Sequence, residues 1–158
     1  MKLSLQNLLL LGLFIISFSM NGQWETMEYV DEFDEPTGET YQAFMAQGTF
    51  SNSATQNAKA SYALIKNKKS LTIKVYEYGS SLATDIDGTF ETVKIKKPDN
   101  SVATINRVFF TKKGSLYFSK DNFKEVNNAI KDKGDYIMIF DRTSDYSESN
   151  YKIKFTIE

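Results

Sequence analysis

Hydrophobic and polar residues alternate along most of the chain, which is the pattern of β-strands with one buried and one solvent-facing side. In the segment 71–76, Leu71, Ile73 and Val75 point to one face, and the residues between them point to the other. The segment 151–157 alternates in the same way. Both segments therefore predict half-buried strands.

Nine strands are predicted in total, separated by turn signals such as P-D-N at 98–100 and K-K-G at 112–114. The predicted strands cover residues 24–30, 40–48, 58–66, 70–78, 90–97, 101–111, 115–118, 134–141 and 150–157. The eighth strand contains Y-I-M-I-F, which is apolar on both faces and is expected in the middle of a sheet.

One helix is predicted between the seventh and eighth strands. Ser119 suits its N-cap, Phe123, Val126 and Ile130 recur at helical spacing, and Gly134 suits its C-terminal stop. The apolar stripe favours packing against the end of a β-structure over binding a cofactor. The sequence therefore predicts an all-β fold, an antiparallel β-sandwich of about nine strands with one short helix before the penultimate strand. A small barrel is the alternative.

Residues 1–22 have the pattern of a secretory signal peptide. Lys2 precedes an apolar stretch, 8–18, which is shorter than the roughly 20 apolar residues that cross a bilayer. Cleavage after Ser19 and cleavage after Gly22 both fit the pattern. A buried N-terminal helix is the alternative, but the segment has no polar face. We therefore expect a secreted or periplasmic protein.

The composition restricts the chemistry of the remaining chain, residues 23–158, which we expect to form a single domain without a membrane span. The chain has no His and no Cys, which excludes a Ser-His-Asp triad, a cysteine nucleophile, an ordinary zinc site and disulfides. The chain has 19 basic residues, one of them Lys2, and 20 acidic residues. Nucleic-acid binders have a basic excess, so this charge balance argues against nucleic-acid binding.

Three acidic segments supply carboxylate oxygens of the kind that calcium prefers: 31–39, 85–91 and 141–148. The D-x-D-G fragment at 85–88 does not have the spacing of an EF-hand, because its Gly comes too early and the closing Glu is missing. We therefore assign no metal ligand and expect no cofactor, with calcium binding as the alternative.

Loops that follow even-numbered strands meet at one end of the fold if every connection reverses the chain direction. Loops gathered at one end of a rigid scaffold are a frequent place for binding. The predicted binding residues would then lie together at one end of the fold, and the acidic segment 31–39 would lie at the opposite end. The predicted binding residues are Asn52, Ser53, Asp85, Asp87 and Asp145.

The stretch G-T-F-S-N-S-A-T at 48–55 also has a purely structural interpretation. Asn52, Ser53 and Thr55 are residue types whose side chains close local turns, and Phe50 would fix the corner in the core.

Two further functions remain open as alternatives. Stacking on sugar rings requires exposed aromatic residues, and Tyr76, Tyr78 and Tyr117 lie on the outward phase of their strands, where cross-strand pairing explains them equally well. A carboxylate-based hydrolase requires a pair of acids, and no pair is singled out.

Five lysines also lie on the outward phase of their strands. Such lysines keep strands soluble and discourage edge pairing, or they form a basic sheet face. They are Lys74, Lys94, Lys96, Lys152 and Lys154.

The order W-E-T-M-E-Y-V-D-E-F-D-E-P-T-G-E-T-Y, then G-T-F-S-N-S-A-T, then L-T-I-K-V-Y-E-Y-G resembles a group of small exported bacterial β-sandwich proteins that are generally uncharacterised. The resemblance covers most of the chain after the signal segment and implies a secreted β-sandwich, with no activity to transfer. We therefore expect an exported, non-catalytic module that binds another protein or the cell surface. A calcium- or carbohydrate-binding module and a carboxylate-based hydrolase are the alternatives.

Overall fold

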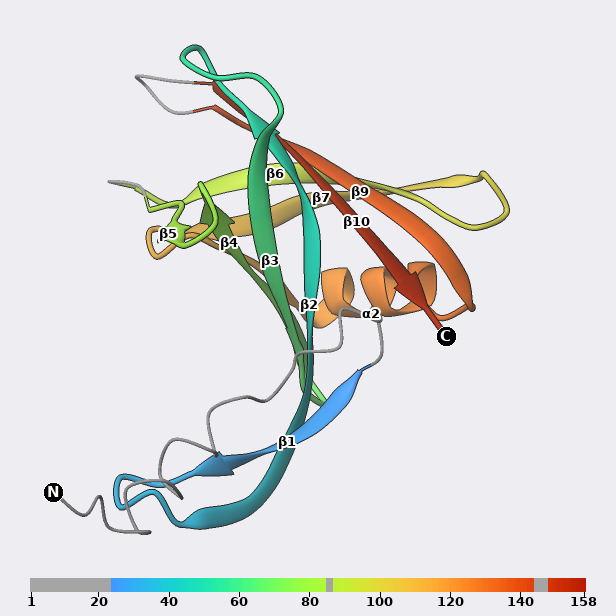
Figure 1. Cartoon of the computed structure of the whole chain (residues 1–158). Helices are drawn as coiled ribbons and strands as arrows, with labels where there is room; N and C mark the ends of the chain where they lie inside the picture. The colour runs from blue at the N-terminus through green and yellow to red at the C-terminus, as the bar shows by residue number, and fades with distance from the viewer. Residues whose placement is uncertain (1–23, 85–86, 144–147) are drawn as a thin grey trace, which may run out of the picture.

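The computed structural model describes residues 24–84, 87–143 and 148–158, which fold mostly into β-strands (Figure 1). The predicted signal segment lies outside these ranges. Within them the elements are β1 (Glu25–Val30), β2 (Pro36–Ser51), β3 (Ala58–Lys66), β4 (Ser70–Glu77), β5 (Ser81–Leu82), β6 (Thr89–Lys96), β7 (Val102–Thr111), β8 (Ser115–Ser119), α2 (Lys120–Ala129), β9 (Gly134–Thr143) and β10 (Glu148–Ile157). No helix in the described ranges is long and apolar enough to cross a membrane.

Eight of these strands form a closed antiparallel barrel. Their order around it is β2-β10-β9-β6-β7-β8-β4-β3, and β3 pairs again with β2. The strand β1 extends the sheet from β2, and β5 adds to β4 outside the ring. The predicted sandwich is therefore wrong, and the chain forms the alternative, a small barrel. The all-β class and the short helix before the penultimate strand are confirmed.

The barrel closes because β2 is paired along both of its edges. Residues 42–50 pair with β3, and residues 47–51 pair with β10. The ring also needs two pairings between strands that are not consecutive, β4 with β8 and β6 with β9. Alternation alone does not separate a sandwich from a barrel, because each strand buries one face in both folds.

Side chains from the inner face of every barrel strand fill the interior. Leu71, Ile73 and Val75, which alternation predicts to point inward, are fully buried. Large aromatic residues on neighbouring strands stack within the interior, as where the ring centroids of Phe140 and Tyr151 lie 4.7 Å apart. An eight-stranded barrel is just wide enough for side chains to fill it, so its interior is a packed core.

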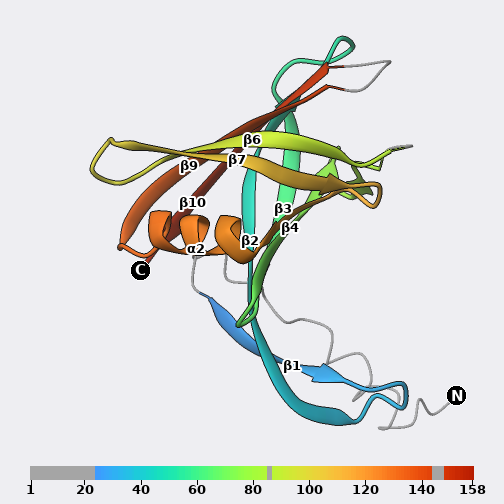
Figure 2. The ribbon, with the colours of Figure 1, turned by 180° about the vertical axis from the view of Figure 1, so that it is seen from behind.

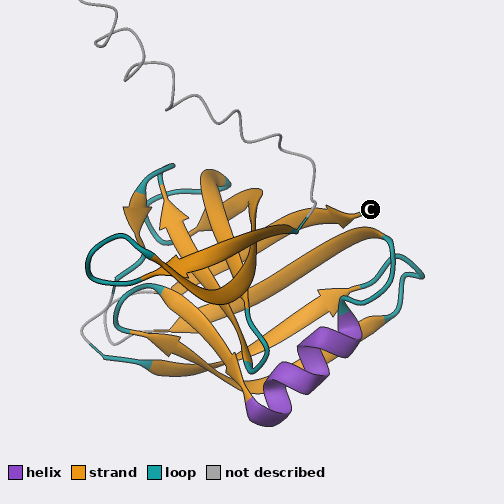
Figure 3. Ribbon diagram, turned by 90° about the horizontal axis from the view of Figure 1, so that it is seen from below, coloured by secondary structure: helices purple, strands orange, loops and turns teal. Residues whose placement is uncertain are grey.

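The helix α2 packs against the end of the barrel that we name the helix end (Figure 2). It contacts β4, β7 and β8 and buries Val126 and Ala129, followed by Ile130. Ser119 occupies the N-cap position, although its side chain makes no capping hydrogen bond. Figure 3 shows the helix lying along the strands at this end. The prediction that its apolar stripe packs against an end of the β-structure is confirmed.

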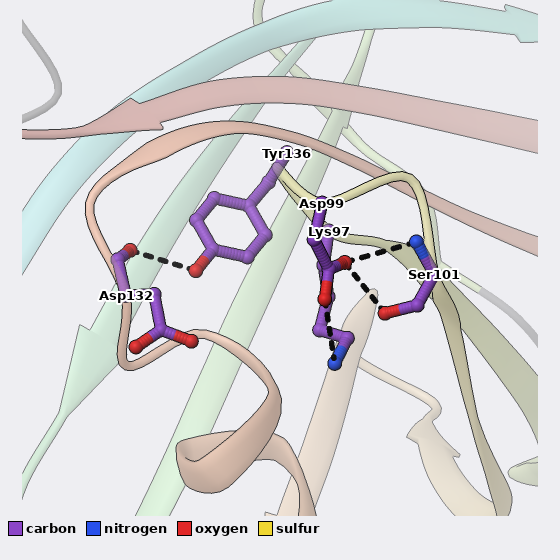
Figure 4. Close-up of polar contacts among 5 residues, drawn as sticks. All are labelled: Lys97, Asp99, Ser101, Asp132 and Tyr136. Carbon is purple, nitrogen blue, oxygen red and sulfur yellow. Dashed lines mark hydrogen bonds and ion pairs between the residues drawn. The ribbon is translucent and has the colours of Figure 1, made fainter.

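Polar contacts close the turns of the helix end (Figure 4). The Tyr136 hydroxyl donates to the Asp132 carbonyl oxygen over 2.7 Å. In the turn between β6 and β7, the Ser101 amide and hydroxyl donate to Asp99 Oδ1, and these bonds lower the pKa of that carboxyl group. Lys97 Nζ lies 3.8 Å from Asp99 Oδ2. These contacts hold the α2–β9 connection and the β6–β7 turn in place.

A two-stranded hairpin extends from the helix end, away from the barrel (Figures 1 and 2). It consists of β1 and the first part of β2, and we name residues 25–41 the arm. The acidic segment 31–39 lies at its tip. The opposite end of the barrel, which we name the loop end, holds the β2–β3, β4–β6 and β7–β8 connections.

We expect Gly48→Ala to destabilise the barrel. A Cβ atom added at this position would overlap the carbonyl oxygen of Lys152 and lie 3.0 Å from a ring carbon of Tyr62. Overpacking of this kind costs about 1–3 kcal/mol, so the thermal midpoint of Gly48→Ala should fall by several degrees. The matched control is Gln47→Ala, at the exposed neighbouring position. Equal midpoints for the two variants would show that β2 and β10 do not approach so closely.

Candidate functional site

The stretch 48–55 forms a corner between β2 and β3. Asn52 Oδ1 accepts hydrogen bonds from the backbone amides of Ala54 and Thr55, both over 2.9 Å. Phe50, just before the corner, is buried and lies edge-on to Tyr78, with 4.9 Å between the ring centroids. The structural interpretation of this stretch therefore explains both its amide side chain and its aromatic anchor.

The predicted binding residues are brought together only in part. Asn52 and Ser53 border one shallow pocket of about 460 Å³, which is lined by Ser51, Asn52, Ser53, Gln56, Asn57, Glu148 and Asn150. Asp87 lies in the β4–β6 connection and pairs with Lys112 over 3.1 Å, with both side chains largely exposed. Asp85 and Asp145 lie outside the described residues. Among the described residues, no three carboxylates, His or Cys are grouped closely enough to hold a metal ion.

A buried polar cluster lies inside the barrel beneath the loop end. The Tyr151 hydroxyl donates to Glu77 Oε1 over 2.6 Å, and the Tyr62 hydroxyl donates to the Thr49 carbonyl oxygen over 3.0 Å. The buried guanidinium of Arg142 lies 4.9 Å from the centre of the Phe110 ring.

Burial also shifts the pKa values of this cluster. It raises the pKa of Glu91 above its usual range, and the hydrogen bond from Thr89, 2.5 Å long, partly offsets this rise. Every buried side-chain polar atom in the described ranges has a hydrogen-bond partner. Since the hydroxyl groups of this cluster bond to Glu77 and to the backbone, we interpret the cluster as the polar closure of the barrel.

The arm is a different kind of surface, because its large apolar side chains are exposed on a hairpin whose first strand has no buried residue. Met27, Tyr29, Val30 and Phe33 are between 38% and 75% exposed, and Phe33 at the tip is the most exposed of them. Tyr29 packs on Tyr41 of the opposite strand, with 4.6 Å between the ring centroids. No residue of β1 is buried, so the arm has no core of its own.

Local hydrogen bonds define the shape of the arm. Asp31 Oδ1 accepts from the amides of Phe33 and Glu35, over 2.8 and 3.0 Å, and so shapes the tip. The Gly38 amide, at a positive φ of 77°, donates to Glu28 Oε1 over 2.7 Å. The arm is therefore a formed hairpin and presents its apolar residues in a set arrangement.

The base of the arm is anchored on the helix end. Trp24, just before β1, lies edge-on to Phe44 with 4.6 Å between the ring centroids. The Lys66 ammonium lies 5.0 Å from the centre of the Trp24 ring and donates to Asn127 of α2 over 3.3 Å. These contacts connect the arm to the barrel at its root. Beyond the root, Tyr29 and Gly38 border a pocket together with Lys68 of the β3–β4 turn.

The charge of the arm is of one sign only. It contains seven carboxylates and no Lys or Arg, and the first basic residue after it is Lys59. The carboxylates are Glu25, Glu28, Asp31, Glu32, Asp34, Glu35 and Glu39. Sequence analysis identified part of this segment as an acidic loop but did not identify the arm as a projecting surface. The absence of any basic residue between Lys2 and Lys59 is the signal that marks it.

No family model matches this chain, and neither does any curated protein or solved structure.

The buried tyrosines predict how stability depends on alkaline pH. Burial raises the pKa of Tyr62 and Tyr151 well above the usual value, and the nearby Glu77 carboxylate adds to the rise. Below about pH 10 both the folded and unfolded chains keep these protons, so the stability is fully present. Above it only the unfolded chain releases them, so the free energy of unfolding falls by up to about 1.4 kcal/mol per pH unit for each tyrosine.

The variant Tyr62→Phe should therefore lose stability more slowly than the wild type between about pH 9 and pH 11 in urea titrations. Tyr117→Phe, at an exposed position of β8, is the matched control and should follow the wild type. If Tyr62→Phe and the wild type have the same slope, the phenol of Tyr62 is not held protonated in the folded barrel.

Proposed function

We propose that this protein is an exported, non-catalytic module that binds another protein through its arm. The observation that carries the proposal is the set of exposed apolar side chains on a formed hairpin, Met27, Tyr29, Val30 and Phe33. Exposed apolar groups rimmed by charged residues are typical of protein-binding surfaces.

The free energy gained by burying the arm against a partner supports this role. A two-stranded hairpin without a buried face is marginally stable in water, and burying its aromatic side chains against a partner would add the missing apolar contacts. Aromatic residues in such positions contribute most of the binding energy in many interfaces. Phe33, which is 75% exposed and makes no ring contact, is the residue that gains most from being covered.

The loop end supports a binding role less well. The Asn52 side chain is already occupied by two backbone amides, and Asp87 is paired with Lys112. Among the described residues of the polar cluster beneath this end, every buried side-chain polar atom already has a hydrogen-bond partner. A ligand bound by the Asn52 amide oxygen or the Asp87 carboxylate would have to replace existing contacts, whereas a partner that covers Phe33 would replace mainly water.

Site-specific photocrosslinking in the cell that produces the protein tests this proposal. A photoreactive phenylalanine analogue at Phe33 should give adducts of discrete mass with a protein partner, because this side chain would be buried in the interface. The same analogue at Tyr117, on the outside of the barrel, is the matched control and should give none. Adducts from an analogue at Ser53 but not at Phe33 would move the binding site to the loop end and contradict the proposal.

A further inference from the structure

The outer face of β6, β9 and β10 forms a basic surface with an apolar centre. Cross-strand pairing places Ile139 between Lys94 and Lys152, and Ile137 between Lys96 and Lys154. All four lysines are exposed, and the two isoleucines between them are half-buried. We name these six residues the lysine face.

The lysine face has no acidic partners of its own. None of its four lysines forms an ion pair with any described residue. The nearest acids along β9 lie at its two ends and are bonded elsewhere. Asp135 accepts a hydrogen bond from Thr156 over 2.7 Å, and Asp141 accepts one from Asn150. The positive charge of this face is therefore available to an acidic partner.

A pocket continues the lysine face towards the helix end, where β10 separates from β2. Its volume is about 440 Å³, and Met45, Ile137 and Phe155 contribute apolar surface to it. Lys154 and Asp135 lie at the same pocket. It is large enough for an aromatic ring, and it combines apolar walls with a polar rim that includes the Lys154 ammonium.

We propose that the arm of one molecule docks on the lysine face of a second copy of this chain, with Phe33 in this pocket. The proposal rests on the proposed function of the arm and names its partner. The two surfaces are complementary, because the arm is acidic with exposed aromatic residues and the lysine face is basic with exposed aliphatic residues. The charges of the chain are divided accordingly: seven of its 20 acidic residues lie in the arm, which leaves 13 against 19 basic residues elsewhere.

The arm does not reach the lysine face of its own molecule. It extends away from the barrel at the helix end, and β1 pairs with β2 alone (Figures 1 and 2). The contact therefore has to form between molecules. It joins two different surfaces, so it is a heterologous contact, which closes only if two arms are exchanged or a ring forms.

Charge reversal tests the contact by sedimentation of the purified protein at low and high salt. The wild type should associate at low salt and dissociate as salt screens the charges. An arm variant, Glu32→Lys with Glu39→Lys, and a face variant, Lys94→Glu with Lys152→Glu, should each weaken self-association by about tenfold or more. The control with the same charge change as the face variant is Lys113→Glu with Lys124→Glu, which should associate as the wild type does.

Mixing the arm variant with the face variant gives a sharper test than either variant alone. The face variant keeps its arm and the arm variant keeps its lysine face, so an equimolar mixture should form a complex that neither variant forms alone. Phe33→Ala should weaken association without lowering the thermal midpoint, because this side chain is 75% exposed in its own molecule. A monomeric wild type at low salt, or a control that dissociates as far as the face variant, would overturn the docking of two copies.

The two proposals fail in different ways. If the wild type is monomeric while the analogue at Phe33 still crosslinks to another protein, self-docking is wrong and the binding function of the arm stands. If the wild type is monomeric and Phe33 gives no adduct, both are wrong.

Discussion

The two edges of β2 determine the rest of this structure. Along one edge residues 42–50 pair with β3, and along the other residues 47–51 pair with β10 while residues 36–43 pair with β1. One continuous strand therefore closes the barrel and also forms half of the arm. Because the barrel fixes the second half of β2, it also fixes the direction in which the arm leaves. Gly48, where β2 and β10 approach closely, lies in the part of the strand that closes the barrel.

The barrel and the arm divide the apolar residues of the chain between two roles. Inside the barrel, aromatic and aliphatic side chains cover one another, and the polar groups beneath the loop end are bonded within the protein. In the arm, apolar side chains face water beside seven carboxylates. A folded barrel does not need these exposed residues for its core. Their presence on a formed hairpin is the reason for assigning them to an interface.

Much of the local structure could be predicted from the sequence. Alternation identified inward residues such as Ile73 and Ile153, and helical spacing identified the stripe that includes Val126. Closure of the sheet could not be predicted, because it depends on pairings between β4 and β8 and between β6 and β9, which are distant in sequence. Residues 24–30 have the alternation of an ordinary strand. Their sequence does not show that no other described element covers β1, which leaves residues 25–30 exposed. The lysine face was visible in the sequence only as outward lysines. The isoleucines lie between them because of the β6–β9 and β9–β10 pairings.

Hydrogen exchange measured by mass spectrometry, at low and at high protein concentration, tests most directly whether the arm is the partner-binding element of a sealed barrel. At low concentration the backbone amides of residues 25–41 should exchange much faster than those of the barrel strands. At high concentration they should become protected, because the arm is then covered by a second copy. Exchange in the arm as slow as in the barrel at every concentration would contradict the account, because it would mean that the arm is already covered within one molecule.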